Sequence, residues 1–217
     1  DAIGITANET TKLLDITFGS DAGTLSYTGD IVVPKTMTKD NVTYITNSVE
    51  FKKADYTKVT SVDISAKKLV NAFGELGKLT GNVALKTLNI DVEEDLVSTS
   101  SVFDNMGFDS VSIATKGTMS ISGFSSNTYA INNFSLLANS YSNCWVLYAP
   151  ESESDNLGDN ISIVALSTNE ESGNKLSFQD ACSFRFKNVR FENIDGESTS
   201  NFISSSYYSL EKADIKN

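Results

Sequence analysis

"TKVTSVDISAKK", residues 57–68, decides the fold of this chain, because its ending recurs along the sequence. Val62 and Ile64 flank the polar Asp63, which is the alternation typical of a strand buried on one face. Six later triplets repeat this pattern of two apolar residues around one other residue. They occupy residues 88–90, 111–113, 134–136, 161–163, 189–191 and 213–215, and from Ile64 onward their last residues are 26, 23, 23, 27, 28 and 24 residues apart.

An aromatic residue precedes each of several triplets and strengthens the repeat. Phe51, Phe178 and Phe202 each lie 13 residues before the end of their triplet, whereas Phe73, Phe103 and Phe124 lie 17, 10 and 12 residues before theirs. The intervening residues form a polar turn or, in "LVNAFGELGKL" (residues 69–79), a run with near-helical apolar spacing. The unit is therefore an aromatic, a turn or helix-like segment, and a short strand.

One such unit cannot cover its own apolar face, so neighbouring units must stack. Stacking would align the strands in one parallel ladder and place the aromatics on the opposite wall. The sequence predicts a β-rich solenoid of leucine-rich-repeat-like α/β type, with short helical or irregular segments between parallel strands. An irregular β-sandwich is one alternative, although sandwich strands usually recur every ~8–12 residues. A right-handed parallel β-helix is another, since "INNFSLLANS" (131–140) and "FKNVRFENIDG" (186–196) look like its coils.

The start of the repeat region resembles a known family. "GTLSYTGDIVVPKTMTKDNVTYITNSVEF" (23–51), followed by "KVTSVDIS" (58–65), is similar to the opening of BspA-like leucine-rich-repeat proteins, which are bacterial surface proteins of Bacteroides-type organisms. The resemblance extends over residues 23–113 and 175–217. It implies an N-terminal segment (1–22) and a single domain (23–217), which comprises a capping β-hairpin over 23–46 and about seven irregular repeats over 47–217. It carries no catalytic residue, because the family is one of binding and adhesion scaffolds.

The composition argues against most kinds of catalysis. The chain has no histidine, which excludes Ser-His-Asp and Cys-His nucleophilic sites as well as histidine zinc sites. It has no Gly-rich phosphate loop, and its two cysteines are too far apart for a CxxC half-site. With 28 acidic and 17 basic residues the net charge is −11, which opposes binding to nucleic acid. We therefore expect no cofactor, no metal and no enzymatic activity.

The charge is unevenly distributed. Residues 1–90 contain ten Lys and ten acidic residues, which leaves seven basic and eighteen acidic residues for 91–217. The acidic runs at 91–95, 151–159 and 169–172 are typical of solvated loops. Cys144 and Cys182 lie beside apolar residues and could be buried thiols or a disulfide, and the sequence leaves both open.

Tyr141, Trp145 and Tyr148 form the best candidate ligand-binding cluster, because Tyr and Trp supply large amphipathic contact areas. Core packing is the alternative for this cluster, because "WVLY" (145–148) is itself a plausible buried strand. The function we expect is an exported, extracellular or cell-surface binding or adhesion module, monomeric and without a membrane-spanning segment, that recognises a protein or glycan. The alternative is a carbohydrate-active enzyme or carbohydrate-binding module on a parallel β-helix.

Overall fold

The computed structural model describes residues 3–126, 131–142, 144–148, 158–166, 176–178, 184–193, 203–204 and 208–216, and most of them lie in strands. The strands are β1 (Ile3–Asn8), β2 (Leu13–Phe18), β3 (Ser26–Val33), β4 (Thr36–Lys39), β5 (Val42–Phe51), β6 (Asp55–Ala66), β7 (Lys68–Val70), β8 (Thr87–Val92), β9 (Leu96–Val102), β10 (Phe108–Thr115), β11 (Thr118–Ser126), β12 (Ile131–Ala138), β13 (Ser140–Tyr141), β14 (Cys144–Tyr148), β15 (Gly158–Ala165), β16 (Leu176–Phe178), β17 (Phe184–Asn193), β18 (Ile203–Ser204) and β19 (Tyr208–Lys216).

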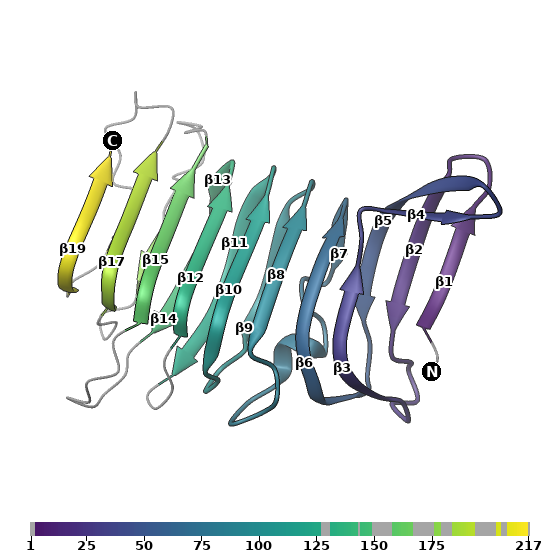
Figure 1. Ribbon diagram of the computed structural model, residues 1–217, viewed down its shortest axis with the longest axis horizontal. Helices are drawn as coiled ribbons and strands as arrows, with labels where there is room; N and C mark the ends of the chain where they lie inside the picture. The colour runs from purple at the N-terminus through teal and green to yellow at the C-terminus, as the bar shows by residue number, and fades with distance from the viewer. Residues whose placement is uncertain are drawn as a thin grey trace.

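Eight of these strands form one parallel sheet in the order β19-β17-β15-β12-β10-β8-β6-β3 (Figure 1). The seven triplets pair in register along it, as their spacing predicts. The last residues of the triplets stand opposite one another in the order Ile64, Ile90, Ile113, Leu136, Ile163, Phe191 and Ile215. Parallel pairing throughout this sheet is unlike the antiparallel sheets of the sandwich alternative.

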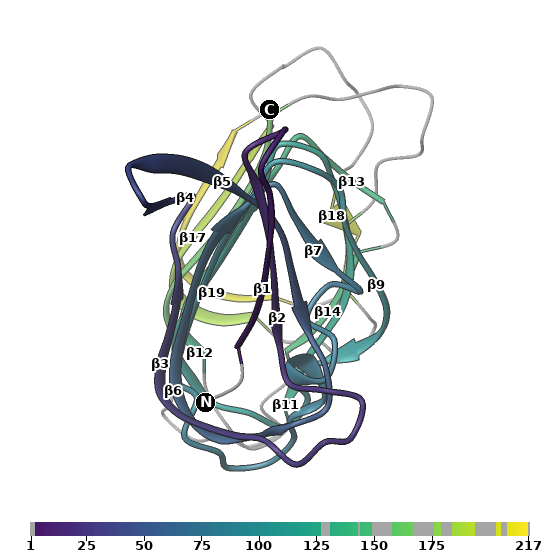
Figure 2. The same cartoon turned by 90° about the vertical axis from the view of Figure 1, so that its right-hand side faces the viewer.

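Between these strands the chain crosses to an opposite wall (Figure 2). That wall consists of a five-stranded sheet, β1-β2-β5-β4 with β7 on β5, and a six-stranded sheet, β13-β11-β14-β16-β18 with β9 on β11. Strands therefore occupy positions where the sequence predicted helical or irregular segments.

The helix-like run 69–79 shows the difference. Its first residues belong to β7, and only Leu76–Lys78 form a turn of 3₁₀ helix, η1. Asn71 and Ala72 have φ values of 54° and 49°, which lie in the left-handed region and prevent a right-handed helix from continuing through them.

The core lies between the walls. Along β6, β8 and β10 the inward-pointing residues alternate with outward-pointing ones, and Ile64, Ile90 and Ile113 are at most 1% exposed. Four aromatics of the repeat, Phe51, Phe73, Phe103 and Phe124, are buried on the other side, as predicted, whereas the side chains of Phe178 and Phe202 lie outside the described residues. Phe73 contacts Phe103 with ring centroids 5.1 Å apart, and Phe103 lies 5.6 Å from Phe124. These aromatic contacts cross from one repeat to the next and make the core continuous.

The N-terminal end differs from the predicted boundaries. Residues 1–22 were expected to form a separate segment, but β2 pairs with β5 and buries Leu14, Ile16 and Phe18. Within the predicted capping hairpin, β3 pairs in parallel with β6, and the antiparallel hairpin is formed by β4 and β5. Asp40 and Asn41 connect β4 and β5 with φ values of 51° and 61°, as a two-residue type I′ turn requires.

Candidate binding face

The outer face of the eight-stranded sheet carries side chains in straight rows, because the strands are parallel and in register. The middle residues of three neighbouring triplets are Ser112, Ser135 and Ser162, which stand opposite one another on β10, β12 and β15. All three serines are partly exposed. We call them the serine row, and adjacent members are separated by the ~4.8 Å spacing of neighbouring strands.

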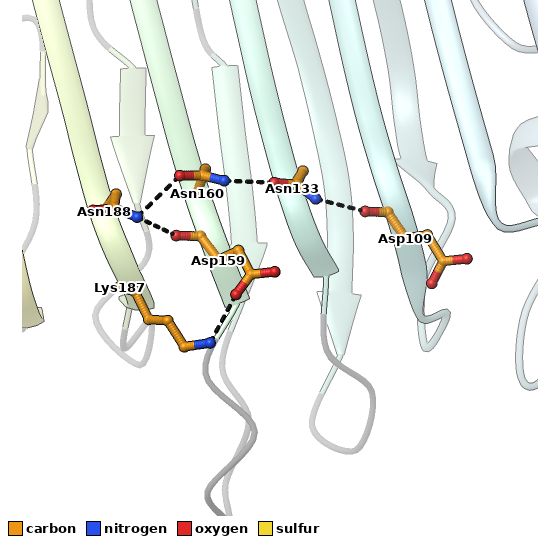
Figure 3. A network of polar contacts seen from close by, with 6 residues as sticks. All are labelled: Asp109, Asn133, Asp159, Asn160, Lys187 and Asn188. Atoms are coloured by element: carbon orange, nitrogen blue, oxygen red, sulfur yellow. Dashed lines mark hydrogen bonds and ion pairs between the residues drawn. The ribbon is translucent and has the colours of Figure 1, made fainter.

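An asparagine ladder runs beside the serine row (Figure 3). Asn160 Nδ2 donates to Asn133 Oδ1 at 2.7 Å, and Asn188 Nδ2 donates to Asn160 Oδ1 at 3.1 Å. Asn133 Nδ2 also donates to the backbone oxygen of Asp109 at 3.2 Å, which extends the ladder to β10. Each asparagine therefore forms a hydrogen bond to the preceding strand on the solvent side of the sheet. On the inner side, the apolar residues of the triplets pack against one another.

Charged side chains lie around the serine row and also beside the asparagine ladder. Asp159 on β15 pairs with Lys187 on β17 at 2.8 Å, and Asp109 lies at the β10 end of the ladder (Figure 3). At the outward positions of the triplets on β10, β12 and β15 the residues are serines, whereas β6 and β8 present Asp63 and Asn89, with Asn89 Nδ2 donating to Asp63 Oδ1 at 2.8 Å. On the other flank, Arg190 Nε donates to Glu192 Oε2 at 2.9 Å on β17. The serine row itself is therefore uncharged on a protein of net charge −11, with charged groups on both flanks and beside the asparagine ladder.

Of the three aromatic residues in the predicted cluster, the structure describes the side chain of Tyr141 only. Tyr141 is 1% exposed, and its hydroxyl donates to the backbone oxygen of Val164 at 2.8 Å. Burial raises the pKa of Tyr141 well above its ordinary value. Tyr141 therefore packs in the core, which is the alternative that the sequence left open for this cluster. Trp145 and Tyr148 lie on β14, and their side chains fall outside the described residues.

Cys144 is a free, fully buried thiol. Burial raises its pKa to about 12, so the reactive thiolate is suppressed at neutral pH. Cys182 lies outside the described residues. Cys144 acts as a small apolar core residue, which is one of the two states that the sequence left open.

The acidic run at 91–95 forms a corner at the end of β8. Glu93 pairs with Lys35 at 2.7 Å and with Lys116 at 3.5 Å. The hydrogen bond from Lys35 lowers the pKa of Glu93 below its ordinary value. Glu94 and Asp95 are exposed after the end of β8, in agreement with a solvated loop, whereas Asp91 is an exposed residue of the strand itself. Among the described residues, no group of three metal-binding side chains comes together. The runs at 151–157 and 169–172 are outside the described residues.

The asparagine ladder makes a measurable prediction. Asn160→Ala removes one donated and one accepted side-chain hydrogen bond, so we expect the free energy of unfolding to fall by about 1–2 kcal/mol. Urea denaturation followed by circular dichroism measures this change. Ser162→Ala on the same strand removes no bond of the ladder and should stay within about 0.5 kcal/mol of the wild type. Equal losses in the two variants would mean that the amide bonds contribute nothing.

Sequence reasoning missed this face although its signal was present. The middle residues of the triplets were recognised only as polar separators between apolar residues. Ser112, Ser135 and Ser162 can be recognised as one row only when the register of the strands places them side by side. Aromatic content, which directed attention to Tyr141, does not distinguish an exposed ring from a buried one.

Models of known protein families, curated proteins and solved structures were compared with the chain. None matches it. In the described part of the chain, no helix has the length and apolar character required to cross a membrane.

Proposed function

We propose that this protein is a non-enzymatic binding module that recognises a large, extended partner through the outer face of its eight-stranded sheet. The observation that carries this proposal is the uncharged serine row beside the asparagine ladder. Rows that cross several strands offer a rigid, periodic array of hydroxyl and amide groups along the stacking direction. A partner that lies across the strands could contact the same group on each successive strand.

The alternation of strands between two walls supports a short solenoid. We infer a leucine-rich-repeat-like architecture related to BspA-like surface proteins, on the basis of the residues at 23–65 quoted above. The abundance of Ser, Thr and Asn and the scarcity of Cys support an exported location, extracellular or on the cell surface. The partner would be a surface protein or a glycan.

The experiment places charge in the centre of the face. Wild-type protein is tested on immobilised panels of purified polysaccharides and purified extracellular proteins, and the strongest binder is measured again with Ser135→Arg. We expect at least a tenfold loss of affinity, because the guanidinium group blocks the serine row. Val97→Arg is the control, since Val97 is 51% exposed on β9 of the opposite wall.

The two variants together test whether the partner binds to the outer face of the eight-stranded sheet. Unchanged binding by Ser135→Arg, or an equal loss in Val97→Arg, would place recognition elsewhere on the molecule. Absence of binding to both panels would contradict the function itself. Circular dichroism and the urea midpoint of each variant verify that folding is unchanged.

A second candidate function is a carbohydrate-active enzyme or carbohydrate-binding module on a parallel β-helix. It is favoured by the opposite wall, where β9, β11, β14, β16 and β18 are parallel strands. Glycoside hydrolysis requires two available carboxyl groups across a cleft. A hollow of about 550 Å³ lies on this wall and is lined by three carboxyl groups, those of Asp21, Glu50 and Glu75. Asp21 and Glu75 are held in ion pairs with Lys52 and Lys78. Release of reducing sugar from any polysaccharide of the panel would favour the enzyme over the binding module.

A further inference from the structure

Strand β1 is an edge with no covering element among the described residues. It pairs with β2 alone, and all six of its residues are exposed. Its outer side therefore presents unpaired backbone N–H and C=O groups. Figure 2 looks onto this end of the molecule and shows β1 as its outermost strand.

Natural proteins usually blunt such edges with charges, proline or β-bulges. The edge at β3 follows this rule: its pairing with β6 is interrupted by two register shifts, and Gly29 has a φ of 78°. Asp30, also on β3, accepts hydrogen bonds from Thr60 and Ser61 at 2.7 Å. Strand β1, with the sequence IGITAN, has no charge, no proline and no bulge in its pairing with β2. It is thus an edge without protection.

Exposed apolar side chains lie on and beside this edge. Ile3 and Ile5 are 45% and 54% exposed, and Val32 on β3 is 64% exposed. Ile3 and Val32 line a hollow of about 520 Å³, whose lining also includes the buried Phe18 and Ile31 and the polar Ser26, Thr28 and Asp30. Ile3, Ile5 and Val32 are therefore exposed apolar side chains at this end of the molecule, next to a hollow of mixed polar and apolar lining. Exposed apolar side chains that gather in this way are typical of interaction sites.

The distribution of charge favours a second copy as the occupant. Residues 1–90 are electrically balanced, with ten Lys and ten acidic residues, whereas residues 91–217 contain eighteen acidic and seven basic residues. Contact through the N-terminal ends would join the neutral parts and keep the anionic parts apart. Two β1 strands related by a two-fold axis are antiparallel, so the same strand serves both partners.

We propose that two copies of this chain associate end to end through antiparallel pairing of their β1 strands, which extends the β1-β2 sheet across the dimer. This dimer replaces the monomer expected from the sequence. It leaves the outer face of each eight-stranded sheet free, and it does not depend on the binding function proposed above.

The test is the molar mass of the full chain by sedimentation equilibrium over a concentration series. We expect the wild type to show a dimer at high concentration, and Ile5→Lys to remain a monomer with at least a tenfold weaker association. Ile5 is exposed, so the fold of the variant should persist, and circular dichroism verifies this. Val97→Lys, which charges an equally exposed valine on the opposite wall, should dimerise as the wild type does.

Hydrogen exchange at two concentrations locates the interface. The amides of β1 should be protected in concentrated wild-type protein and exchange quickly in Ile5→Lys. A monomeric wild type, a dimer that survives Ile5→Lys, or β1 amides whose exchange is independent of concentration would each overturn the proposal.

Discussion

Phe103→Ala should lower the free energy of unfolding by about 3–5 kcal/mol, because it removes a fully buried ring from a well-packed core. Phe103 contacts Phe73, Phe108 and Phe124, with ring centroids 5.1, 5.7 and 5.6 Å apart. It therefore connects three repeats, and the cavity left by its removal would weaken each of these contacts. Urea denaturation followed by tryptophan fluorescence and circular dichroism gives the change in free energy.

Phe103→Leu is the matched control for this loss. The φ of Phe103 is 54°, a left-handed conformation that costs energy for either substitute, so the backbone contribution is the same in both variants. Leu keeps most of the apolar volume and should lose clearly less stability than Ala. A loss below about 1 kcal/mol in Phe103→Ala would show that the aromatic contacts do not hold the repeats together.

Gly123→Ala should destabilise the opposite wall by several kcal/mol. A Cβ atom at Gly123 on β11 would lie 2.2 Å from the backbone oxygen and 2.6 Å from the backbone nitrogen of Val102 on β9. Since β9 and β11 pair at these residues, the two strands would have to separate. Crowding of this kind costs about 1–3 kcal/mol, and the φ of 148°, which L side chains rarely adopt, adds a backbone penalty.

Gly29→Ala separates the two causes. Gly29 has a φ of 78°, but a Cβ atom there would meet no atom within 4 Å. We expect this variant to lose only the backbone contribution of about 1–2 kcal/mol. Thermal and urea denaturation of both variants measure the difference. Equal losses would mean that the close approach of β9 and β11 does not determine the effect.

The inward half of the fold could be predicted from the sequence because it depends on a short-range pattern. When a strand is buried on one side, the two apolar residues of a triplet must face the core and the residue between them must face solvent. The regular spacing of the triplets then indicates which strands pair. The burial of Phe51, Phe73, Phe103 and Phe124 followed from the same reasoning. The conformation of residues 69–79 did not, because apolar spacing cannot reveal the left-handed residues Asn71 and Ala72.

The candidate face was less accessible to sequence reasoning. Ser112, Ser135 and Ser162 are unremarkable individually, and they form a row only because parallel pairing aligns strands that are 23 and 27 residues apart. Tyr141 was assigned to a ligand surface on its residue type alone. Its hydroxyl donates to the backbone oxygen of Val164 inside the protein. This contact joins β13 to β15, and a local sequence pattern cannot reveal it.

The sequence alone therefore determined the repeat, the parallel ladder and the inward side of each strand, since these depend on the alternation of apolar residues within a few positions. The tertiary structure decided which polar residues meet on the outside, that strands rather than helical segments form the opposite wall, and that β1 pairs with β2 alone among the described residues. These features depend on which distant strands become neighbours and on the space left between them. Both are properties of the assembled stack and not of any single repeat.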